Sequence, residues 1–253
     1  MKVIPVSALS DNYIWLIEGM NKQQVICVDP GDASPVLEVL KEKNLTLEAI
    51  LLTHHHFDHI GGTAGLLKAY PHLSVYGPKD MRIPYVTHTL QGGDILALDS
   101  YQFTILSTPG HTSTHICFYE PQQKWLFCGD TLFSAGCGRV FDGSIEALHD
   151  SLQMLKTLPD DTQVYCAHEY TQQNLRFAAT VEPNNPAIYH HLQKLLNQVP
   201  PCSLPSTITL EKQINPFFRI QVAAVKEYAK LKGCQEQDSL SVFRQIRAEK
   251  DKF

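Results

Sequence analysis

The sequence has little that would place it in a membrane, on nucleic acid or outside the cell. No apolar run among its 253 residues approaches the ~20 positions that a membrane helix needs. The first residues lack a secretory pattern, because Pro5, Ser10 and Asp11 interrupt the short apolar segments there. Lysine and arginine number 21 against 26 aspartates and glutamates, so no basic surplus neutralises phosphates. We therefore expect a cytoplasmic protein with neither a membrane nor nucleic acid as a partner.

Signatures of disulfides and of cysteine-based metal sites are also missing. The seven cysteines are an odd number, and no two of them form a CxxC pair. Because disulfides persist in oxidising compartments, we interpret all seven as reduced thiols that are mostly buried as small apolar residues. The apolar content of 43% is ordinary for a globular protein and supplies a core for one large domain, with or without a small second one.

The first two thirds of the chain mix strand and helix patterns. Short apolar runs predict strands at residues 13–18, 23–29, 49–52, 74–77, 101–108, 115–120, 124–130 and 163–168. Apolar spacing close to 3.6 residues predicts helices at 34–44, 58–70 and 144–158.

After about Tyr170 strand patterns are absent and helical patterns replace them. The predicted helices cover residues 171–182, 185–199, 219–233 and 238–251, with proline-rich joints between them. We place a domain boundary near residue 172, which gives a mixed α/β domain over 1–172 and a helical domain over 173–253.

Histidine, in contrast, is concentrated in one place. Residues 53–59, THHHFDH, hold four histidines and an aspartate directly after an apolar run, and four of these form H-x-H-x-D-H: His54, His56, Asp58 and His59. His54 and His56 point the same way if the backbone stays extended, and a helix that begins at Asp58 turns the other two toward the same space. Imidazole and carboxylate suit zinc, iron or manganese, so this loop predicts donors for two neighbouring metal ions. His55 should point away and serve a structural or hydrogen-bonding role.

Four donors are too few for two ions, and three further candidates directly follow predicted strands. These are His111 in STPGHTSTH, Asp130 in FCGDTLF and His168 in YCAHEY. A carboxylate can bridge two cations, and Asp130 is the natural bridge. The predicted sets are His54, His56, His111 and Asp130 on one ion, and Asp58, His59, His168 and Asp130 on the other.

The remaining polar candidates favour ordinary structural roles. A single histidine at a strand end is usually a satisfied polar residue, and only the whole pattern makes a metal site the better interpretation. We interpret His72, His88, His149, His190 and His191 as surface or packing residues. His115 stays open between a packing role and a hydrogen bond to a metal-binding residue. Cys137, between two glycines, suggests a tight turn rather than a nucleophile.

The motifs THHHFDH, GHT, GD and AHEY, in this order, resemble the metallo-β-lactamase superfamily. That resemblance implies a four-layer αβ/βα sandwich with the metals at the edge of two packed sheets. GDTLFSAGCGR, HEYT, NPFFR and the terminal RAEKDKF further resemble the glyoxalase II family, the hydroxyacylglutathione hydrolases, over nearly the whole chain. The family's metal ligands fall on the same seven positions, residues 1–172 would be the catalytic domain, and residues 173–253 the substrate-binding domain.

The resemblance implies hydrolysis of the thioester S-D-lactoylglutathione to D-lactate and glutathione by a metal-bound hydroxide, the second step of methylglyoxal detoxification. It implies two divalent ions, zinc in the first place and iron or manganese as open alternatives, with Asp58 and Asp130 in catalytic roles. The family's glutathione-binding positions fall on Arg139, Phe141, Tyr170, Arg247 and Lys250. Many members carry Lys and Tyr at the first two, so the charge is kept here but a hydroxyl is lost. We expect a monomer.

Three rivals have to be weighed. A glutathione-persulfide dioxygenase of the same superfamily uses one iron and has a GCGR-like loop, but the helical NPFFR-containing region argues against it. A metallo-β-lactamase would usually be secreted, whereas this sequence lacks a secretory pattern. A non-catalytic metal-binding protein has no use for seven donors around an open site. Without the resemblance, RAEKDK would indicate a solvated helix face, so the roles of Arg247 and Lys250 depend on it.

Overall fold

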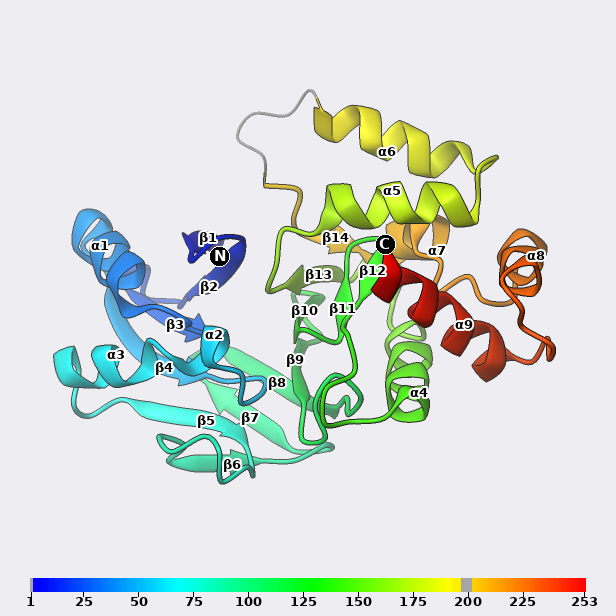
Figure 1. Cartoon of the computed structure of the whole chain (residues 1–253). Coiled ribbons are helices and arrows are strands. Elements are labelled where there is room, and N and C mark those ends of the chain that lie inside the picture. Colours follow the sequence, from blue (N-terminus) through cyan, green and yellow to red (C-terminus); the bar gives the residue numbers. More distant parts are fainter. Residues whose placement is uncertain (1, 197–201) are drawn as a thin grey trace. The chain divides into compact units, whose positions relative to one another are not determined.

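The computed structural model describes residues 2–196 and 202–253, so the end of the helix predicted over 185–199 lies outside the described residues. The chain divides into two compact units (Figure 1). Unit 1 comprises residues 1–108 and 114–129, and unit 2 comprises residues 109–113 and 130–253. In the sequence, the chain therefore passes from one unit to the other near His111 and at Asp130, two of the predicted metal donors.

Unit 1 is built on strands with three helices. The strands are β1 (Val3–Ala8), β2 (Asn12–Glu18), β3 (Gln24–Val28), β4 (Thr46–Leu51), β5 (Ser74–Pro78), β6 (His88–Leu90), β7 (Ile95–Leu98), β8 (Tyr101–Ser107), β9 (Ile116–Glu120) and β10 (Trp125–Gly129). The helices are α1 (Ala33–Lys43), α2 (Phe57–Ile60) and α3 (Thr63–Ala69).

Two strand arrangements make up unit 1. The first is a mixed sheet in the order β1-β2-β3-β4-β5-β6, antiparallel from β1 to β3 and parallel from β3 to β6. The parallel pairs need crossover connections, and α1 supplies the one between β3 and β4. The second arrangement runs β10-β9-β8-β7 with antiparallel neighbours.

Helix α1 packs its apolar face on the mixed sheet, and Figure 1 shows α1 and α3 beside the strands of that sheet. Asp32 caps its start by accepting a hydrogen bond from the Ser34 N–H, and Asn44 ends it in the left-handed conformation with φ 52°. Val36 and Leu40 are buried against strand residues such as Leu16 and Ile50. This core holds the carboxyl ends of β3 and β4 in place, where the histidine-rich loop begins.

The helix predicted over 58–70 is in fact two helices, α2 and α3, separated at Gly61 and Gly62. The backbone of the preceding loop approaches closely here: the Gly62 N–H donates to the Pro30 carbonyl, and a Cβ at Gly62 would lie 2.5 Å from the Asp32 carbonyl carbon. The helix breaks because packing against residues 30–33 takes precedence over apolar spacing.

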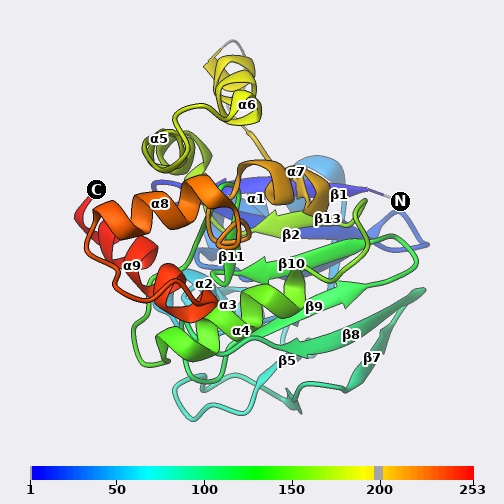
Figure 2. The same ribbon diagram turned by 90° about the vertical axis from the view of Figure 1, so that its right-hand side faces the viewer.

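Unit 2 contains the remaining elements. They are β11 (Leu132–Phe133), β12 (Gly136–Cys137), α4 (Ile145–Leu155), β13 (Gln163–Cys166), α5 (Thr171–Val181), α6 (Pro186–Leu196), β14 (Ser206–Thr207), α7 (Ile208–Ile214), α8 (Ala223–Leu231) and α9 (Ser239–Lys252). Helices α5, α6 and α7 share a core that includes Leu175, Ile188 and Ile214. Helices α8 and α9 lie side by side (Figure 2).

The prediction of a purely helical region beyond residue 172 was wrong in one detail. Strand β14 pairs antiparallel with β13, with Val164 opposite Ser206. A two-residue strand has no local signature, because its partner alone defines it. Helix α7 was not predicted either: at seven residues it is short for a periodic pattern, although Thr207 caps it by accepting from the Leu210 N–H.

Two expectations from composition can be compared with the structure. All seven cysteines are free thiols, and all but Cys202 are buried. Among the residues that the structure describes, no helix combines the length and the apolar character needed to cross a membrane.

Candidate metal centre

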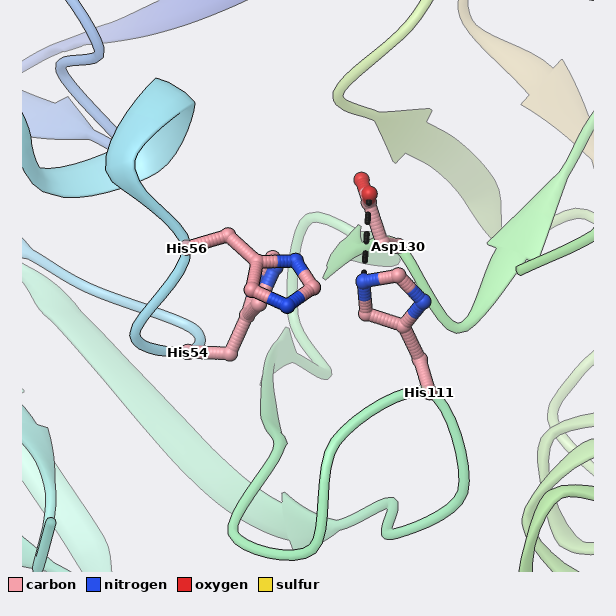
Figure 3. A group of neighbouring side chains, drawn as sticks. All are labelled: His54, His56, His111 and Asp130. Atoms are coloured by element: carbon pink, nitrogen blue, oxygen red, sulfur yellow. Dashed lines mark ion pairs between the residues drawn. The ribbon is translucent and has the colours of Figure 1, made fainter. Parts of the chain in front are cut away.

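The histidine-rich loop leaves β4 and carries its first two donors on the same side. The rings of His54 and His56 lie 4.7 Å apart between centroids, and both extend from the same side of the loop in Figure 3. His54 is fully buried, whereas His56 is partly exposed. The His55 ring lies 4.8 Å from that of His56, and its Nδ1 faces the Asp80 carboxylate.

One buried carboxylate, that of Asp29, orients two of these histidines. Its Oδ2 accepts from the Thr53 hydroxyl at 2.7 Å and lies 3.0 Å from His59 Nδ1. Since the single hydroxyl proton of Thr53 is given to Asp29, Thr53 Oγ1 accepts from His54 Nδ1 at 3.0 Å. The hydrogen-bond partners thus assign the proton to Nδ1 in both rings and the lone pair to Nε2, the form that binds a metal ion.

Asp58, on α2, is held by Asn12 at the start of β2. The Asn12 side-chain amide donates to Asp58 Oδ2 at 3.0 Å, and the same oxygen lies 3.5 Å from His59 Nε2. Sequence reasoning missed Asp29, Thr53 and Asn12. The segment VDPGD, a carboxylate directly after a strand, was a signal for the first of them, whereas nothing local pointed to Asn12.

Gly129, the last residue of β10, makes room for the loop. It has φ +47°, and a Cβ there would lie 2.4 Å from Thr53 Oγ1 and 2.8 Å from His115 Nε2. His115 is itself buried, stacks on the His54 ring at 4.8 Å, and contacts Thr108 Oγ1 through its Nδ1. The structure therefore places His115 as a packing partner of a predicted donor.

In unit 2 the carboxylate of Asp130 faces a different histidine with each of its oxygens. Oδ2 lies 3.5 Å from His111 Nε2, marked by the dashed line in Figure 3, and Oδ1 lies 3.4 Å from His168 Nε2. Two ligand atoms that each lie about 2.1 Å from one ion at a tetrahedral angle are about 3.4 Å apart. Both separations match that value, so each Asp130 oxygen and its histidine are spaced as two ligands of one ion would be.

The loop after Asp130 also orients His111. The Arg139 carbonyl accepts from His111 Nδ1 at 2.6 Å, which again assigns the lone pair to Nε2. Gly138 allows this approach, because a Cβ there would lie 2.0 Å from the Asp130 carbonyl oxygen and 3.0 Å from His111 Nδ1. Gly138 therefore serves close backbone packing against two predicted donors, whereas Gly136 makes room for the Asn174 side chain.

Among the residues that the structure describes, the groups of side chains that could hold a metal ion consist of the seven predicted donors. All are histidine or aspartate, and neither group contains a cysteine. Such a donor set fits zinc, iron or manganese and gives no preference among them.

Comparison with known proteins connects this chemistry to a family. Residues 9–168 match the metallo-beta-lactamase superfamily, and residues 169–253 match the hydroxyacylglutathione hydrolase C-terminus. A hydroxyacylglutathione hydrolase of Legionella pneumophila (strain Corby) is 54% identical over 253 residues, covering 100% of both chains. One of Aliivibrio fischeri (strain ATCC 700601 / ES114) is 46% identical over 255 residues, again with 100% coverage of both. The chain belongs to the hydroxyacylglutathione hydrolase family.

The superfamily fold is matched by solved structures as well. TTHA1623, in a di-iron-bound form, is 28% identical, with a TM-score of 0.63 over 85% of this chain and 99% of that chain. The α/β metallo-β-lactamase fold predicted from the sequence is thereby confirmed, with the helical C-terminal region that distinguishes this hydrolase family. The fold and its histidine and aspartate donors support a pair of divalent metal ions.

The five residues predicted to bind the substrate all lie in unit 2. Arg139 has an exposed side chain, and Phe141, 62% exposed, meets the His111 ring edge-on at 5.2 Å. Tyr170 stacks on His168 at 4.7 Å with 7° between the rings. The rings of Phe141 and Tyr170 thus lie against two of the predicted donors, whereas the Arg139 side chain pairs with Asp251 at 3.1 Å.

Helix α9 carries the other two positions in different settings. Arg247 is buried and donates to the Cys137 carbonyl at 2.9 Å, with its guanidinium 5.3 Å from the Phe217 ring centroid. The Lys250 ammonium lies 5.4 Å from the Phe177 ring centroid and is partly exposed. Arg247 therefore has a structural role, and its part in substrate binding stays a prediction.

A first prediction concerns His55, whose Nδ1 lies 3.6 Å from Asp80 Oδ2. Arg82 holds the pKa of that carboxyl well below its usual range, so Asp80 stays ionised and gives His55 a fixed charged neighbour. We expect His55→Ala to keep two metal equivalents and turnover within about twofold of the parent. Metal analysis by mass spectrometry tests this, with His56→Ala as the control expected to lose metal. Loss of one equivalent from His55→Ala would contradict it.

Proposed function

We propose that this chain hydrolyses S-D-lactoylglutathione to D-lactate and glutathione, as the second step of methylglyoxal detoxification. The observation that carries the proposal is the Asp130 carboxylate, with one oxygen toward each of two histidines, in a chain of this family. A glutathione-persulfide dioxygenase and a non-catalytic metal-binding protein remain the alternatives, and neither is favoured by the full-length relatives.

We propose that two ions are held by His54, His56, Asp58, His59, His111, Asp130 and His168, with Asp130 shared. When bound, two divalent cations supply hydroxide at neutral pH, by lowering the pKa of water toward ~7, and polarise the thioester carbonyl. The residues of the chain prepare this chemistry: Asp29, Thr53 and the Arg139 carbonyl fix the imidazole tautomers. The donor types and these tautomers support the proposal.

The two carboxylates have different surroundings. Asp58 is partly exposed, and Asn12 fixes one of its oxygens. Asp130 is 6% exposed. We propose that Asp58 accepts a hydrogen bond from the attacking water and keeps that water oriented toward the carbonyl, while Asp130 fixes the spacing of the two ions. The departing thiolate needs no dedicated acid, because its parent thiol has a pKa of only about 8.5.

We propose that the glutathione peptide binds to Arg139, Phe141, Tyr170, Arg247 and Lys250, and that residues 173–253 are the substrate-binding domain. The peptide carries carboxylates, and these positions offer three cations and two aromatic rings. Phe141 cannot donate the hydrogen bond that a tyrosine would, so its contribution is apolar contact. Zinc as the ion, a cytoplasmic location and a monomeric state complete the proposal on sequence grounds.

The deciding experiment is hydrolysis of S-D-lactoylglutathione by protein reconstituted with zinc, iron or manganese. We expect D-lactate and free glutathione in equal amounts, with activity rising to two metal equivalents. Oxygen uptake on glutathione persulfide is the counter-test for the dioxygenase. Metal binding without turnover of either substrate would leave the non-catalytic alternative.

A pH prediction follows from Lys250. Burial, followed by the neighbouring Arg247, lowers the pKa of its ammonium to about 8, against the opposing effects of Cys137 and Asp251. A bound carboxylate needs the protonated form, so affinity for the peptide should fall as pH rises through 8. The effect on folding runs in the opposite direction. Burying the charged ammonium lowers the free energy of unfolding, and this free energy recovers as pH rises from about 8 to the ordinary lysine value near 10.4.

We therefore expect KM for S-D-lactoylglutathione to rise between pH 7 and 9. Lys250→Met should flatten this rise, because methionine does not titrate. The substrate's own amine contributes equally to the pH dependence of both proteins. Initial rates corrected for alkaline self-hydrolysis of the thioester are the measurement. An unchanged pH slope in Lys250→Met would exclude Lys250 as the titrating group.

A further inference from the structure

A carboxylate of the chain itself lies among the cations proposed to bind the peptide. Asp251, on α9, accepts from Arg139 Nε at 3.1 Å and from Arg247 Nη2 at 3.1 Å, both through Oδ1. Its charge also acts on the adjacent Lys250, whose pKa it raises. Asp251 therefore touches or influences all three cations of the proposed peptide site.

We infer that Asp251 is an internal competitor of the substrate: it holds Arg139 and Arg247 as a substrate carboxylate would, and thereby limits affinity for the glutathione peptide. The inference rests on the proposed function to the extent that these cations bind that peptide. It adds a residue that sets substrate affinity to those the family resemblance supplies.

The two halves of this contact differ in how easily they can exchange. The Arg247 side chain is 8% exposed, and the Cys137 carbonyl holds it independently of Asp251. The Arg139 side chain is 59% exposed and that of Asp251 is 39% exposed, so water competes for their pair. Arg139 can therefore exchange the Asp251 carboxylate for that of an incoming ligand, while Arg247 keeps its position.

Charge explains the direction of the effect. Arg139, Arg247 and Lys250 attract anions, and Asp251 cancels part of that attraction at contact distance. Replacing Asp251 by asparagine leaves only a weaker, neutral acceptor and removes a like charge from the site, so an anionic peptide should bind more tightly. If Asp251 served only to preorganise the two arginines, its loss would weaken binding instead.

The test compares Asp251→Asn with Glu249→Gln in the metal-loaded enzyme. Both changes are isosteric, and each removes one negative charge from α9. Glu249 pairs with Lys252 at 2.8 Å and with Lys232 at 3.9 Å, so it controls for overall charge. The ligand is S-methylglutathione, a thioether that cannot be hydrolysed, titrated calorimetrically at 20 mM and 500 mM salt.

We expect Asp251→Asn to bind S-methylglutathione about three- to tenfold more tightly than the parent at low salt, with a smaller gain at high salt. Glu249→Gln should change affinity by less than about twofold. Equal or weaker binding by Asp251→Asn, an equal gain in Glu249→Gln, or no measurable binding by either the parent or Asp251→Asn would overturn the inference.

Kinetics separate this inference from the proposed function. If the proposed function holds, the ratio of kcat/KM on S-D-lactoylglutathione to kcat/KM on S-lactoyl-N-acetylcysteamine, a thioester without the peptide, should rise in Asp251→Asn. If the parent turns over neither thioester, the proposed function fails, while the S-methylglutathione titration still decides whether Asp251 competes.

Discussion

Asp130→Asn should lose turnover by at least about a hundredfold and should disturb the occupancy of both metal positions. Each oxygen of the native carboxylate lies about one ligand separation from a histidine, at 3.5 Å from His111 and 3.4 Å from His168. Asparagine keeps the shape but offers one neutral oxygen and one amide donor, so one histidine faces a group that repels cations. Metal equivalents by mass spectrometry and kcat on S-D-lactoylglutathione measure the two effects separately.

The matched control is Asp150→Asn, which makes the same chemical change at an exposed helix position of the same unit. It should keep two metal equivalents and normal turnover. The bridging role of Asp130 is refuted by a variant that holds two full equivalents with an unchanged kcat.

Arg247→Ala should combine a loss of stability with a loss of substrate affinity. The guanidinium is buried, donates to the Cys137 carbonyl at 2.9 Å and packs over Phe217. Removing it leaves a buried carbonyl unsatisfied and a cavity beside an aromatic ring, which should cost about 2–4 kcal/mol of unfolding free energy. A missing charge-assisted bond to the peptide should raise KM by about tenfold or more.

Lys250→Ala separates the two effects, because Lys250 is partly exposed and rests on aromatic rings. It should raise KM on S-D-lactoylglutathione, keep activity on a peptide-free thioester, and unfold in urea close to the parent midpoint. Arg247→Ala should unfold earlier and lose some activity on both substrates, with the larger loss on the peptide. Equal losses on both substrates in both variants would leave only a structural role for the pair.

The sequence predicts much of the candidate site, because chemistry-bearing residues follow strands directly. His111 and His168 stand out because they follow strands in a chain that also holds H-x-H-x-D-H, and the spacing of His54 and His56 indicates a common side of the loop. The partners that set the tautomers, Thr53 and Asp29, come from different strands that only the folded sheet brings together. The hydrogen bond from Asn12 to Asp58 spans 46 residues and leaves no local pattern.

The elements of the fold likewise differ in whether local sequence or distant contacts determine them. Strands and helices with clear periodicity are predictable, as for α4 and α5, which begin and end within a few residues of the expected ranges. The break between α2 and α3 was not predicted, because it depends on the backbone of residues 30–33 lying against Gly62. Strand β14 exists only as the partner of β13. Contacts between distant segments, rather than local preference, decide these elements.

Asp29 has a consequence for how the protein acquires its ions. Because it already fixes Thr53 and His59 through hydrogen bonds within the fold, little ordering of these side chains remains to be done when an ion arrives. The affinity of such nitrogen and oxygen donors for divalent metal ions follows a general order, and they distinguish poorly between metals that are adjacent in that order. We therefore expect the composition of the centre to follow the ions available during growth, so that the metal supply influences the properties of the enzyme.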